Sequence, residues 1–436
     1  MVESEWTEFL AGLDRQQRRR HRSPDRATLL DLMGLHRVPA VSVAVAQEGV
    51  EPWAAAYGTA GTGTVFQACS ISKHVAAFGT LRLVDQGVLD LDEDAHTYLT
   101  SWRLPDVGGA RPRITVRQLL AHTAGLSYNW FRGFHQDDRI PTLRQVLDGE
   151  PPANTPPVRA TTLPGSRFRY SGSHYAVLQQ LLEDVTDTPF ASLAHSLVLE
   201  PLGMRHSGYD QQFPHHRDAA AGHHLDGTPV SGGWRVQPEL AGAGLWTTPS
   251  DLVKLGAEIR TGALGLLTGE TTEQMLTPQV PGGYGLGVHV DATGRFGHTG
   301  GNVGYGCWTF TWPSTGATMA VMANNEVADE ILLGLLAEAE RRYGAPPPGA
   351  GDPTGAWRLR DDYRFTVTGA DGHLVLTAPG LPPLPLHHLG RGRYRAADLD
   401  CEIRLLDDDT LEVTQEQEAE TAAREPRSRP VDPDRA

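Results

Sequence analysis

A Pro- and Gly-rich segment, GAPPPGAGDP at residues 344–353, separates two parts of the chain that have different sequence patterns. Proline removes a backbone donor and glycine has little conformational preference, so such a segment continues neither a helix nor a central strand. Residues 27–343 mix helical and strand patterns, whereas residues 354–413 alternate in hydrophobicity, which is typical of short strands joined by turns. The sequence therefore predicts two domains joined by a linker, with a small all-β domain second.

The two ends of the chain lack the apolar content of a packed domain. Residues 1–26 are polar and arginine-rich, and their RQQRRRHR run (15–22) is interpreted as a solvated helix face rather than as an interaction arm. Residues 414–436 are charged and contain several prolines, a composition that favours disorder. We therefore expect a polar N-terminal extension and a disordered C-terminal tail.

Composition and charge argue against several kinds of partner and site. The formal net charge of −15 disfavours binding to nucleic acid or to anionic membrane surfaces. The three cysteines are far apart and lack metal-ligand spacing, so neither a disulfide framework nor a cysteine zinc site is expected. No apolar run follows the basic N-terminal residues, and no stretch is long enough to span a membrane. We expect a cytoplasmic protein.

Within the larger domain, helical spacing and capping residues predict a set of helices around a set of strands. The expected helices are 27–38, 72–87, 114–126, 173–187, 251–260 and 328–343. Strands are expected at 40–49, in the segment that directly follows residue 49, and in the glycine-rich region between 282 and 324. Residues 127–165 hold several prolines and little periodicity, which indicates a long loop region over a cleft.

Lysine occurs only twice in this chain, at Lys73 and Lys254, while arginine supplies the other basic residues. Lys73 follows Ser70 by three residues in FQACSISKHVAAFG, at the start of a helical pattern, and that spacing places both on one helix face. A serine hydroxyl becomes a nucleophile when a base removes its proton. A lysine with a lowered pKa can be that base, whereas arginine does not deprotonate in proteins. Because Ser-x-x-Lys is common by chance, a surface lysine is the alternative.

Two further stretches add to this pair. RFRYSGSHY places Tyr170 in a Tyr-Ser-Gly tripeptide just before a predicted helix, and GRFGHTGGNVGYG places His298 in a His-Thr-Gly tripeptide of a glycine-rich strand. Each has a simple structural alternative, a packing tyrosine and a turn. Glycines in such a strand let the backbone approach a substrate closely. The three motifs in this order favour a catalytic interpretation.

With these motifs, the chain resembles the serine β-lactamase and penicillin-binding-protein superfamily, whose signature is Ser-x-x-Lys, Tyr-x-Asn or a variant, and Lys/His-Thr-Gly. Stretches such as ITVRQLLAHTAGL and AGAGLWTTPSDLVKLG are similar to its class C-like branch, which includes DD-peptidases, D-aminopeptidases, carboxylesterases and penicillin-binding-protein-type thioesterases. The resemblance covers about residues 28 to 343. It implies an α+β fold, an antiparallel sheet flanked by helices with a helical subdomain, and an active site in the cleft between them.

The resemblance also implies roles for individual residues. Ser70 matches the acylated nucleophile and Lys73 its general base. Tyr170 matches the group that relays a proton to the leaving group and helps to activate the deacylating nucleophile. His298 matches the residue of the third motif that lines the cleft, where it would bias the Tyr170 proton or contact a substrate carboxylate. The implied reaction is a two-step acyl transfer with no metal and no organic cofactor.

The substrate-binding positions include one departure from the family pattern. Backbone N–H groups of Ser70 and Gly301 match the oxyanion hole, and Thr299 and Gly300 complete the third motif beside the substrate. In the second motif the family has an asparagine whose amide contacts the substrate amide and the lysine, but here that position is Gly172. This weakens the expectation of a β-lactamase more than that of an esterase or transacylase.

Three functions stay open at this point. The first is hydrolysis of esters or of small amides, including amides of D-residues, with a small-molecule or peptide acyl substrate. The second is an acyltransferase or peptide cyclase of a biosynthetic pathway, which takes its acyl group from a carrier-protein-bound thioester; the lack of an export signal favours it over cell-wall work. The third is a non-catalytic binding protein on the same fold.

Two other candidate sites are weaker. The segment FPHHRDAAAGHHLDG at 213–227 holds four histidines, but neither pair has helical metal-ligand spacing and loop histidines at a cleft rim are the preferred interpretation. Cys69 precedes Ser70 and is an alternative nucleophile, although a small buried residue behind the helix start is the preferred interpretation.

Overall fold

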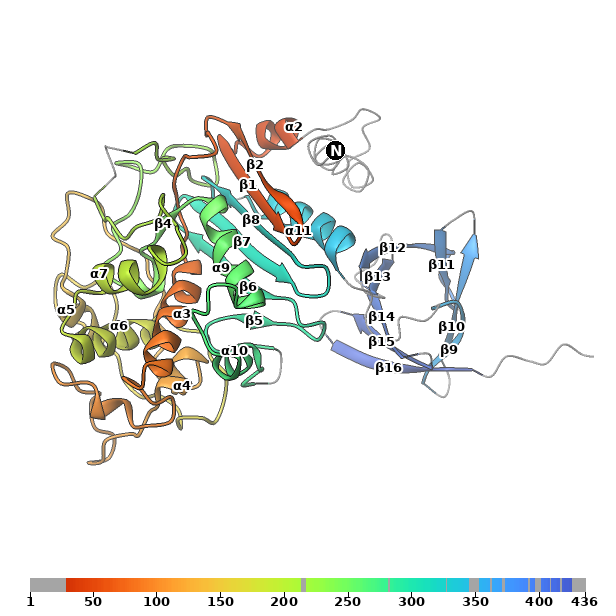
Figure 1. Cartoon of the computed structure of the whole chain (residues 1–436). Helices are drawn as coiled ribbons and strands as arrows, with labels where there is room; N and C mark the ends of the chain where they lie inside the picture. Colours follow the sequence, from red (N-terminus) through yellow and green to blue (C-terminus); the bar gives the residue numbers. More distant parts are fainter. Residues whose placement is uncertain are drawn as a thin grey trace, which may run out of the picture. The chain divides into compact units, whose positions relative to one another are not determined.

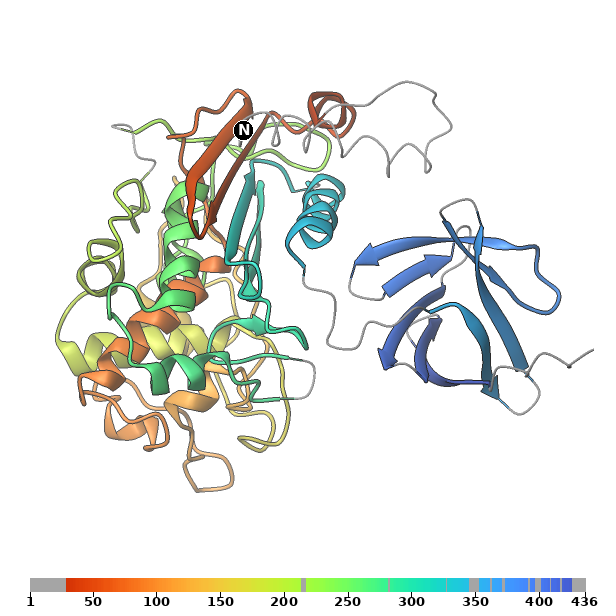
Figure 2. The same cartoon turned by 45° about the vertical axis from the view of Figure 1, so that its right-hand side comes forward.

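A computed structural model shows two compact units, one ending at Leu335 and one beginning at Leu336. It describes residues 29–212, 217–280, 283–326, 328–344, 353–360, 363–370, 373–390, 393–396, 401–407, 409–415 and 418–425. The predicted N-terminal extension and most of the predicted linker therefore lie outside the described residues. Figures 1 and 2 show the elements of each unit.

The first unit is built on a six-stranded antiparallel sheet with the strand order β2-β1-β8-β7-β6-β5. Its strands are β1 (Ala40–Gln47), β2 (Val50–Gly58), β5 (His289–Val290), β6 (Phe296–Asn302), β7 (Tyr305–Trp312) and β8 (Ala317–Ala323). The register pairs Val43 with Ala55 and Val321, and β7 and β8 are buried along their whole length. A two-stranded sheet of β3 (Phe66–Gln67) and β4 (Trp246–Thr247) lies apart from it.

Helices cover both faces of the six-stranded sheet (Figure 2). Helix α9 (Pro249–Thr261) contacts β1, β7 and β8, and an added Cβ at its Gly256 would lie 2.4 Å from the Oγ1 atom of Thr311. On the opposite face, the indole N–H of Trp308 donates to the carbonyl of Leu332 in α11 (Asp329–Tyr343). Side chains alternate between the faces of a strand, so residues 308 and 311 of β7 face different helices. This arrangement confirms the predicted antiparallel sheet flanked by helices.

The remaining helices gather to one side of the sheet and form the predicted helical subdomain (Figure 1). They are α3 (Ile71–Asp85), η1 (Ala95–Thr97), α4 (Val116–Leu120), α5 (Leu143–Asp148), α6 (Gly172–Thr186), α7 (Phe190–Ala194), the π-type turn η2 (His195–Leu199), α8 (Leu240–Ala243) and α10 (Gly269–Leu276). Helix α2 (Leu29–Leu35) is not part of this group and lies beside β2. Thr115 caps α4 with Gln118 in a capping box, as the sequence around the predicted N-cap suggested.

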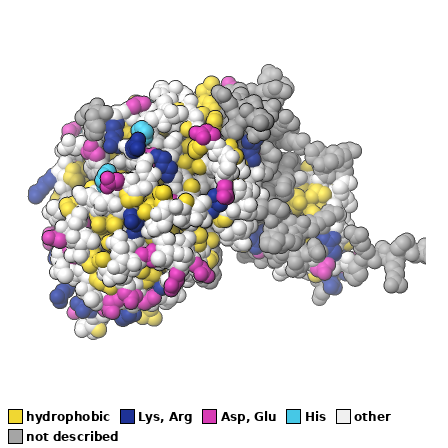
Figure 3. Space-filling view, viewed as in Figure 1, with side chains coloured by type: hydrophobic (Ala, Val, Ile, Leu, Met, Phe, Trp, Pro, Cys, Tyr) yellow, Lys and Arg dark blue, Asp and Glu magenta, His cyan; other side chains and the backbone are white. Residues whose placement is uncertain are grey.

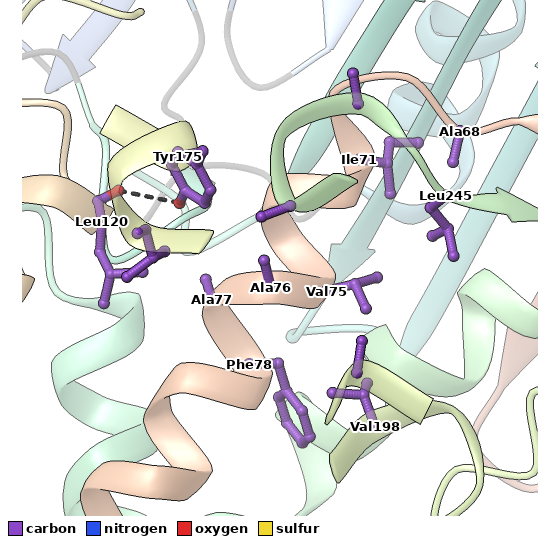
Figure 4. Packing of buried hydrophobic residues seen from close by; sticks show 14 of the residues in the cluster. Ala68, Ile71, Val75, Ala76, Ala77, Phe78, Leu120, Tyr175, Val198 and Leu245 are labelled. Atoms are coloured by element: carbon purple, nitrogen blue, oxygen red, sulfur yellow. Dashed lines mark hydrogen bonds between the residues drawn. The ribbon is translucent and has the colours of Figure 1, made fainter. Parts of the chain in front are cut away.

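Helix α3 runs through the centre of this unit. Every residue from Ile71 to Leu81 is buried, so the helix is surrounded by packing partners on all sides. Figure 4 shows Val75 and Phe78 beside Val198, and Ala77 facing Tyr175, whose hydroxyl donates to the carbonyl of Leu120. A helix held on every side fixes the position of its first turn, where Ser70 and Lys73 lie.

The second unit is a closed antiparallel barrel in the order β10-β11-β12-β13-β14-β15-β16-β9. Its strands are β9 (Gly355–Arg360), β10 (Tyr363–Ala370), β11 (His373–Thr377), β12 (Leu384–Gly390), β13 (Arg393–Ala396), β14 (Cys401–Asp407), β15 (Thr410–Gln415) and β16 (Glu418–Arg424). Trp357, Val367, Ile403 and Leu411 fill its interior. The all-β second domain is confirmed, and the expected hairpin pairs Ala370 with His373.

The end of this barrel differs from the sequence-based expectation. Disorder was predicted from residue 414 onward, yet β15 continues to Gln415 and β16 pairs with both β15 and β9. The charged composition of β16 suggested a solvated tail, but a barrel strand needs an apolar residue only on its inner face. Ala422 fills that role with no exposure, and β16 joins β9 so that the barrel has no open edge. Residues 426–436 lie outside the described residues.

The surface of the described residues shows no separation of charge on the face drawn in Figure 3, where basic and acidic side chains are interspersed over the first unit. No helix in the described ranges combines the length and the apolar content that crossing a bilayer requires. The expected absence of nucleic-acid and membrane partners, and the expected cytoplasmic location, stay predictions.

Candidate active site

The candidate nucleophile lies at a sharp junction between β3 and α3. Cys69, directly before Ser70, has a positive φ of 51°, which is uncommon for a residue other than glycine and indicates local backbone strain. Ser70 is the N-cap residue of α3, but its side chain makes no capping hydrogen bond. Serine at an N-cap usually caps the helix through its hydroxyl. The Ser70 hydroxyl is therefore available to other groups.

Two side chains reach the Ser70 hydroxyl. The Nζ atom of Lys73 donates to the Oγ atom of Ser70 over 3.0 Å and to the carbonyl oxygen of Gly242 over 2.8 Å. The phenol of Tyr170 lies near the Ser70 side chain, and their interaction partly offsets the rise in the phenol pKa that burial causes. Tyr170 stands one residue before Ser171, the N-cap residue of α6, as the sequence predicted. The structure thus brings together three residues that are up to 100 positions apart in the chain.

Lys73 is buried, with 2% of its surface exposed. Desolvation disfavours the charged ammonium and lowers the pKa of Lys73 from 10.5 to about 7. Three aromatic rings surround the Nζ atom, with their centroids at 5.1 Å for Tyr170, 5.7 Å for Phe131 and 5.8 Å for Tyr175. At neutral pH a large fraction of this amine is uncharged and able to accept a proton.

Tyr170 and Glu239 are two of the titratable groups that surround this pair. Burial raises the pKa of the Tyr170 phenol far above its ordinary value, so the phenol keeps its proton and acts as a donor. Burial also raises the pKa of Glu239 to about 7, and its charge interacts with that of Lys73. Near pH 7 these shifts leave the Lys73 amine partly neutral while the Tyr170 phenol stays protonated.

His298 lies on β6 in the same cluster but is enclosed by protein. Its Nδ1 atom lies 2.5 Å from the carbonyl oxygen of Thr299, and its Nε2 atom lies 3.3 Å from the hydroxyl of Tyr284. A carbonyl only accepts, so Nδ1 carries the proton and Nε2 accepts from Tyr284. Burial lowers the pKa of His298 well below its ordinary value. The imidazole is therefore neutral with both nitrogens engaged, and its predicted role towards Tyr170 or a substrate carboxylate stays a prediction.

The glycines of the third motif bring β6 against the nucleophile segment. A Cβ atom added at Gly300 would lie 2.7 Å from the carbonyl oxygen of Ala68 and 2.9 Å from the Cβ atom of Cys69. Nothing lies within 4 Å of the corresponding position at Gly301. Thr299 and Gly301 are exposed, so this edge of β6 is open beside Ser70. The placement is compatible with the predicted oxyanion-hole role of the Ser70 and Gly301 N–H groups, which stays a prediction.

Several residues of the site were not found from the sequence. Gly242 supplies a carbonyl acceptor to Lys73, Tyr284 holds His298, and the ring of Phe131 packs beside Gly172. Gly242 belongs to the stretch AGAGLWTTPSDLVKLG, which resembles the family, and that likeness was the available signal. Phe131 comes from a loop without periodicity, so no pattern pointed to it.

The structure also describes Cys69 and two of the four histidines that were considered as alternative sites. Cys69 is fully buried, and its Sγ atom lies 3.4 Å from the carbonyl oxygen of Gln67. A thiol without solvent exposure is not accessible to a substrate. Of the four histidines, His215 and His216 lie outside the described residues, while the His223 imidazole faces the Asn324 carbonyl. Within the described ranges, no three His, Cys, Asp or Glu side chains are grouped as a metal site.

A comparison with known protein families shows to which family this chain belongs. A family model described as Beta-lactamase matches residues 26–339. The chain belongs to the beta-lactamase family. Because the match includes Ser70, Lys73, Tyr170 and His298, the resemblance inferred from the motifs is confirmed.

Two curated relatives of this beta-lactamase family chain each align with slightly less than half of it. It is 33% identical over 211 residues to Esterase EstB from Burkholderia gladioli, a match that covers 46% of this chain and 53% of EstB. The chain therefore spans about half the length of that curated relative. It is 25% identical over 199 residues to Protein flp from Staphylococcus aureus (strain MRSA252), covering 45% of this chain and 37% of that protein.

A solved structure extends the likeness beyond the region that the family model matches. The octameric penicillin-binding protein homologue from Pyrococcus abyssi aligns with a TM-score of 0.56 at 21% identity, covering 90% of this chain and 98% of that one. At this identity the likeness shows a shared fold. The coverage of 90% extends beyond the 26–339 match, so the shared fold includes part of the barrel unit.

Proposed function

We propose that this protein is a serine hydrolase that cleaves esters through an acyl-enzyme on Ser70. The observation that carries the proposal is the hydrogen bond between the Lys73 amine and a serine hydroxyl that does not cap its helix. A buried amine with a pKa near 7 can remove the hydroxyl proton at neutral pH. The name of its relative EstB, an esterase, supports the same reaction class.

The proposed reaction has two steps. Lys73 takes the proton from the Ser70 hydroxyl as the oxygen attacks the ester carbonyl, and the oxyanion is held by the N–H groups of Ser70 and Gly301. The C–O bond to the alcohol then breaks, and the alcohol leaves with a proton delivered through Tyr170, which is restored from Lys73. In the second step water attacks the acyl-Ser70 ester and loses a proton to the same pair. The C–O bond to Ser70 then breaks as the pair returns this proton to the Ser70 oxygen, which releases the carboxylic acid and free Ser70.

A purely binding role fits this geometry less well. Burying Lys73 costs free energy, and this cost lowers the pKa of its amine, whose hydrogen bonds within the described residues go to one hydroxyl and one carbonyl. A binding site has no need of an amine that is ready to accept a proton. The charge state of Lys73 therefore favours catalysis over binding.

Acyl transfer is a second candidate, because the acyl-enzyme is common to both reactions. Another structural neighbour is described as EstCE1, a hydrolase with promiscuous acyltransferase activity (TM-score 0.58, 22% identity, covering 75% of this chain and 95% of that one). In this chain an alcohol or an amine, or the amine of a peptide delivered as a carrier-protein thioester, would replace water in the second step. The first step and its residues are unchanged.

The test is hydrolysis of p-nitrophenyl pentanoate by the purified full chain. We expect Ser70→Ala to lower kcat/KM to the background rate, a loss of at least about 1,000-fold. Ser196→Ala, at an exposed position in η2, is the matched control and should retain the wild-type rate. Adding methanol or glycinamide separates the two candidates by the share of acyl group recovered as ester or amide. Equal rates for wild type and Ser70→Ala would refute both.

A further inference from the structure

The ring of Phe131 fills the space beside the second motif. A Cβ atom added at Gly172 would lie 2.4 Å from the Cζ atom of Phe131, and one added at Gly242 would lie 2.4 Å from its Cε2 atom. These glycines begin α6 and lie within α8, so two separate helices leave room for the same ring. The ring is 92% buried, with only 8% of Phe131 exposed.

The backbone conformation does not require glycine at either position. Gly172 and Gly242 are absent from the positions with positive φ, and both lie in helices, where any residue other than proline is sterically allowed. A side chain at either position would collide with the aromatic ring rather than with backbone. The absence of a side chain at position 172, which departs from the family pattern, is thus explained by the presence of Phe131.

The loop that carries Phe131 is fixed on both sides of the ring. Before it, the carbonyl oxygen of Asn129 accepts the N–H of Gly172 over 3.0 Å, and the N–H of Asn129 donates to the Ser171 hydroxyl over 3.1 Å. After it, Phe134 and Val236 exchange two backbone hydrogen bonds of 2.9 and 2.8 Å. These contacts tie the loop directly to the second motif and to the segment before α8, so the ring has a defined place.

The ring changes the chemistry of the wall next to Lys73. Its centroid lies 5.7 Å from the Nζ atom of Lys73, at the position where the resemblance places an asparagine amide. An asparagine side chain offers two donors and one acceptor, whereas a phenyl ring offers neither to an amide. A substrate amide placed against this wall would lose its hydration without gaining a hydrogen bond, and such a loss is costly.

We propose that Phe131 is a specificity-determining residue that replaces the missing amide of the second motif and selects acyl groups with apolar carbons next to the scissile carbonyl. This inference rests on the proposed acyl-enzyme function and names its substrate class. The preferred donors are esters of simple aliphatic or aromatic acids. Acyl groups with an amide on the carbon beside the carbonyl, as in N-acylamino acids and peptides, are disfavoured.

Two esters with one leaving group test this selection. p-Nitrophenyl pentanoate and p-nitrophenyl N-acetylglycinate have acyl chains of equal length, and each rate is corrected for the reaction of the ester with hydroxide. We expect the wild type to prefer the pentanoyl ester in kcat/KM by at least tenfold. The double variant Phe131→Ala/Gly172→Asn, which exchanges the ring for an amide, should reduce this preference at least tenfold. Phe131→Leu, which stays apolar, should retain it.

A control and a second readout separate specificity from general damage. Phe190→Ala removes a buried ring of α7 that packs against Tyr209, and its ester preference should stay within twofold of the wild type. In the double variant the amine of Lys73 loses its apolar cover, so the midpoint of the pH–rate profile should move to higher pH. A purely structural role for Phe131 would lower both rates together and leave this midpoint in place.

The outcomes distinguish the inference from the proposed function. Ser70-dependent hydrolysis with an unchanged ester preference in the double variant would overturn the role of Phe131 but leave the hydrolase intact. If the double variant does not fold, a wild-type preference for the N-acetylglycyl ester, or loss of selection in Phe131→Leu, still overturns it. Absence of any Ser70-dependent hydrolysis would instead refute the proposed function.

Discussion

The amine of Lys73 donates to the hydroxyl of Ser70 over 3.0 Å, and its second acceptor is a backbone carbonyl, that of Gly242. The pair occupies the first turn of α3, a helix that the core encloses on every side. Because the charge of Lys73 is poorly solvated there, the amine is held close to the point of losing its proton. This relationship makes several measurable predictions.

Replacing Lys73 with arginine tests whether the side chain at this position must lose a proton. Lys73→Arg keeps a positive charge but removes the base, since a guanidinium does not deprotonate in proteins, and we expect kcat/KM to fall by at least about 1,000-fold. The matched control is Lys254→Arg at the only other lysine, which is partly exposed and pairs with Asp251 at 2.7 Å. That variant should retain the wild-type rate. Substantial activity in Lys73→Arg would mean that another group is the base.

The pH–rate profile tests the pKa of Lys73 directly. The pKa of this amine is lowered to about 7, so the active, neutral form predominates above pH 7 and is lost below it. We expect kcat/KM to level off above about pH 7 and to fall tenfold per pH unit below it. Glu239→Gln should move the midpoint to lower pH, because it removes a carboxylate that stabilises the ammonium. A midpoint near pH 10 would contradict the burial of the amine.

The same pKa shift predicts a cost in stability. The unfolded chain binds a proton at Lys73 below about pH 10.5 and the folded chain only below about 7, so wild-type stability rises with pH in this window. Lys73→Met removes this dependence and keeps a similar volume. We expect Lys73→Met to be more stable than the wild type at pH 7, with the difference shrinking by about 1.4 kcal/mol per pH unit above pH 7. Urea unfolding between pH 7 and 9.5 measures it; a constant difference would contradict it.

Two adjacent glycines give opposite predictions for alanine substitution. An alanine Cβ at position 300 would meet the Ala68 carbonyl and the Cys69 side chain, whereas position 301 is open. We expect Gly300→Ala to lower the free energy of unfolding by about 2 kcal/mol and to reduce kcat/KM strongly, because β6 and the Ser70 segment must separate. Gly301→Ala keeps its N–H group and should stay within a few-fold of the wild type. Similar effects of the two variants on stability and rate would argue against this packing.

Most features that depend on residues close together in the chain could be predicted from the sequence. Ser70 and Lys73 follow from helical spacing and from the scarcity of lysine, and the individual strands and helices follow from the pattern between β1 and α11. The antiparallel arrangement of the sheet was implied by the family resemblance. The role of His298 stays a prediction, and the sequence does not show that Tyr284 and Thr299 engage both of its ring nitrogens. Such contacts depend on how distant segments meet.

Two findings needed the three-dimensional structure for that reason. The meeting of Phe131 with Gly172 and Gly242 joins positions more than 40 residues apart, and the loop around Phe131 has no periodic pattern. Strand β16 is polar enough to suggest a solvated tail, yet closure of the barrel gives its backbone two neighbours. In both cases the decisive physical term is a long-range contact rather than a local preference.

The most direct test of the central claim is intact-protein mass spectrometry during turnover of p-nitrophenyl pentanoate, with peptide mapping of the quenched enzyme. The account predicts a mass increase of one pentanoyl group, located on the peptide that contains Ser70 and absent from Ser70→Ala. Lys73→Arg should form this adduct far more slowly. Turnover with no adduct, or an adduct that persists in Ser70→Ala, would contradict the acyl-enzyme on Ser70.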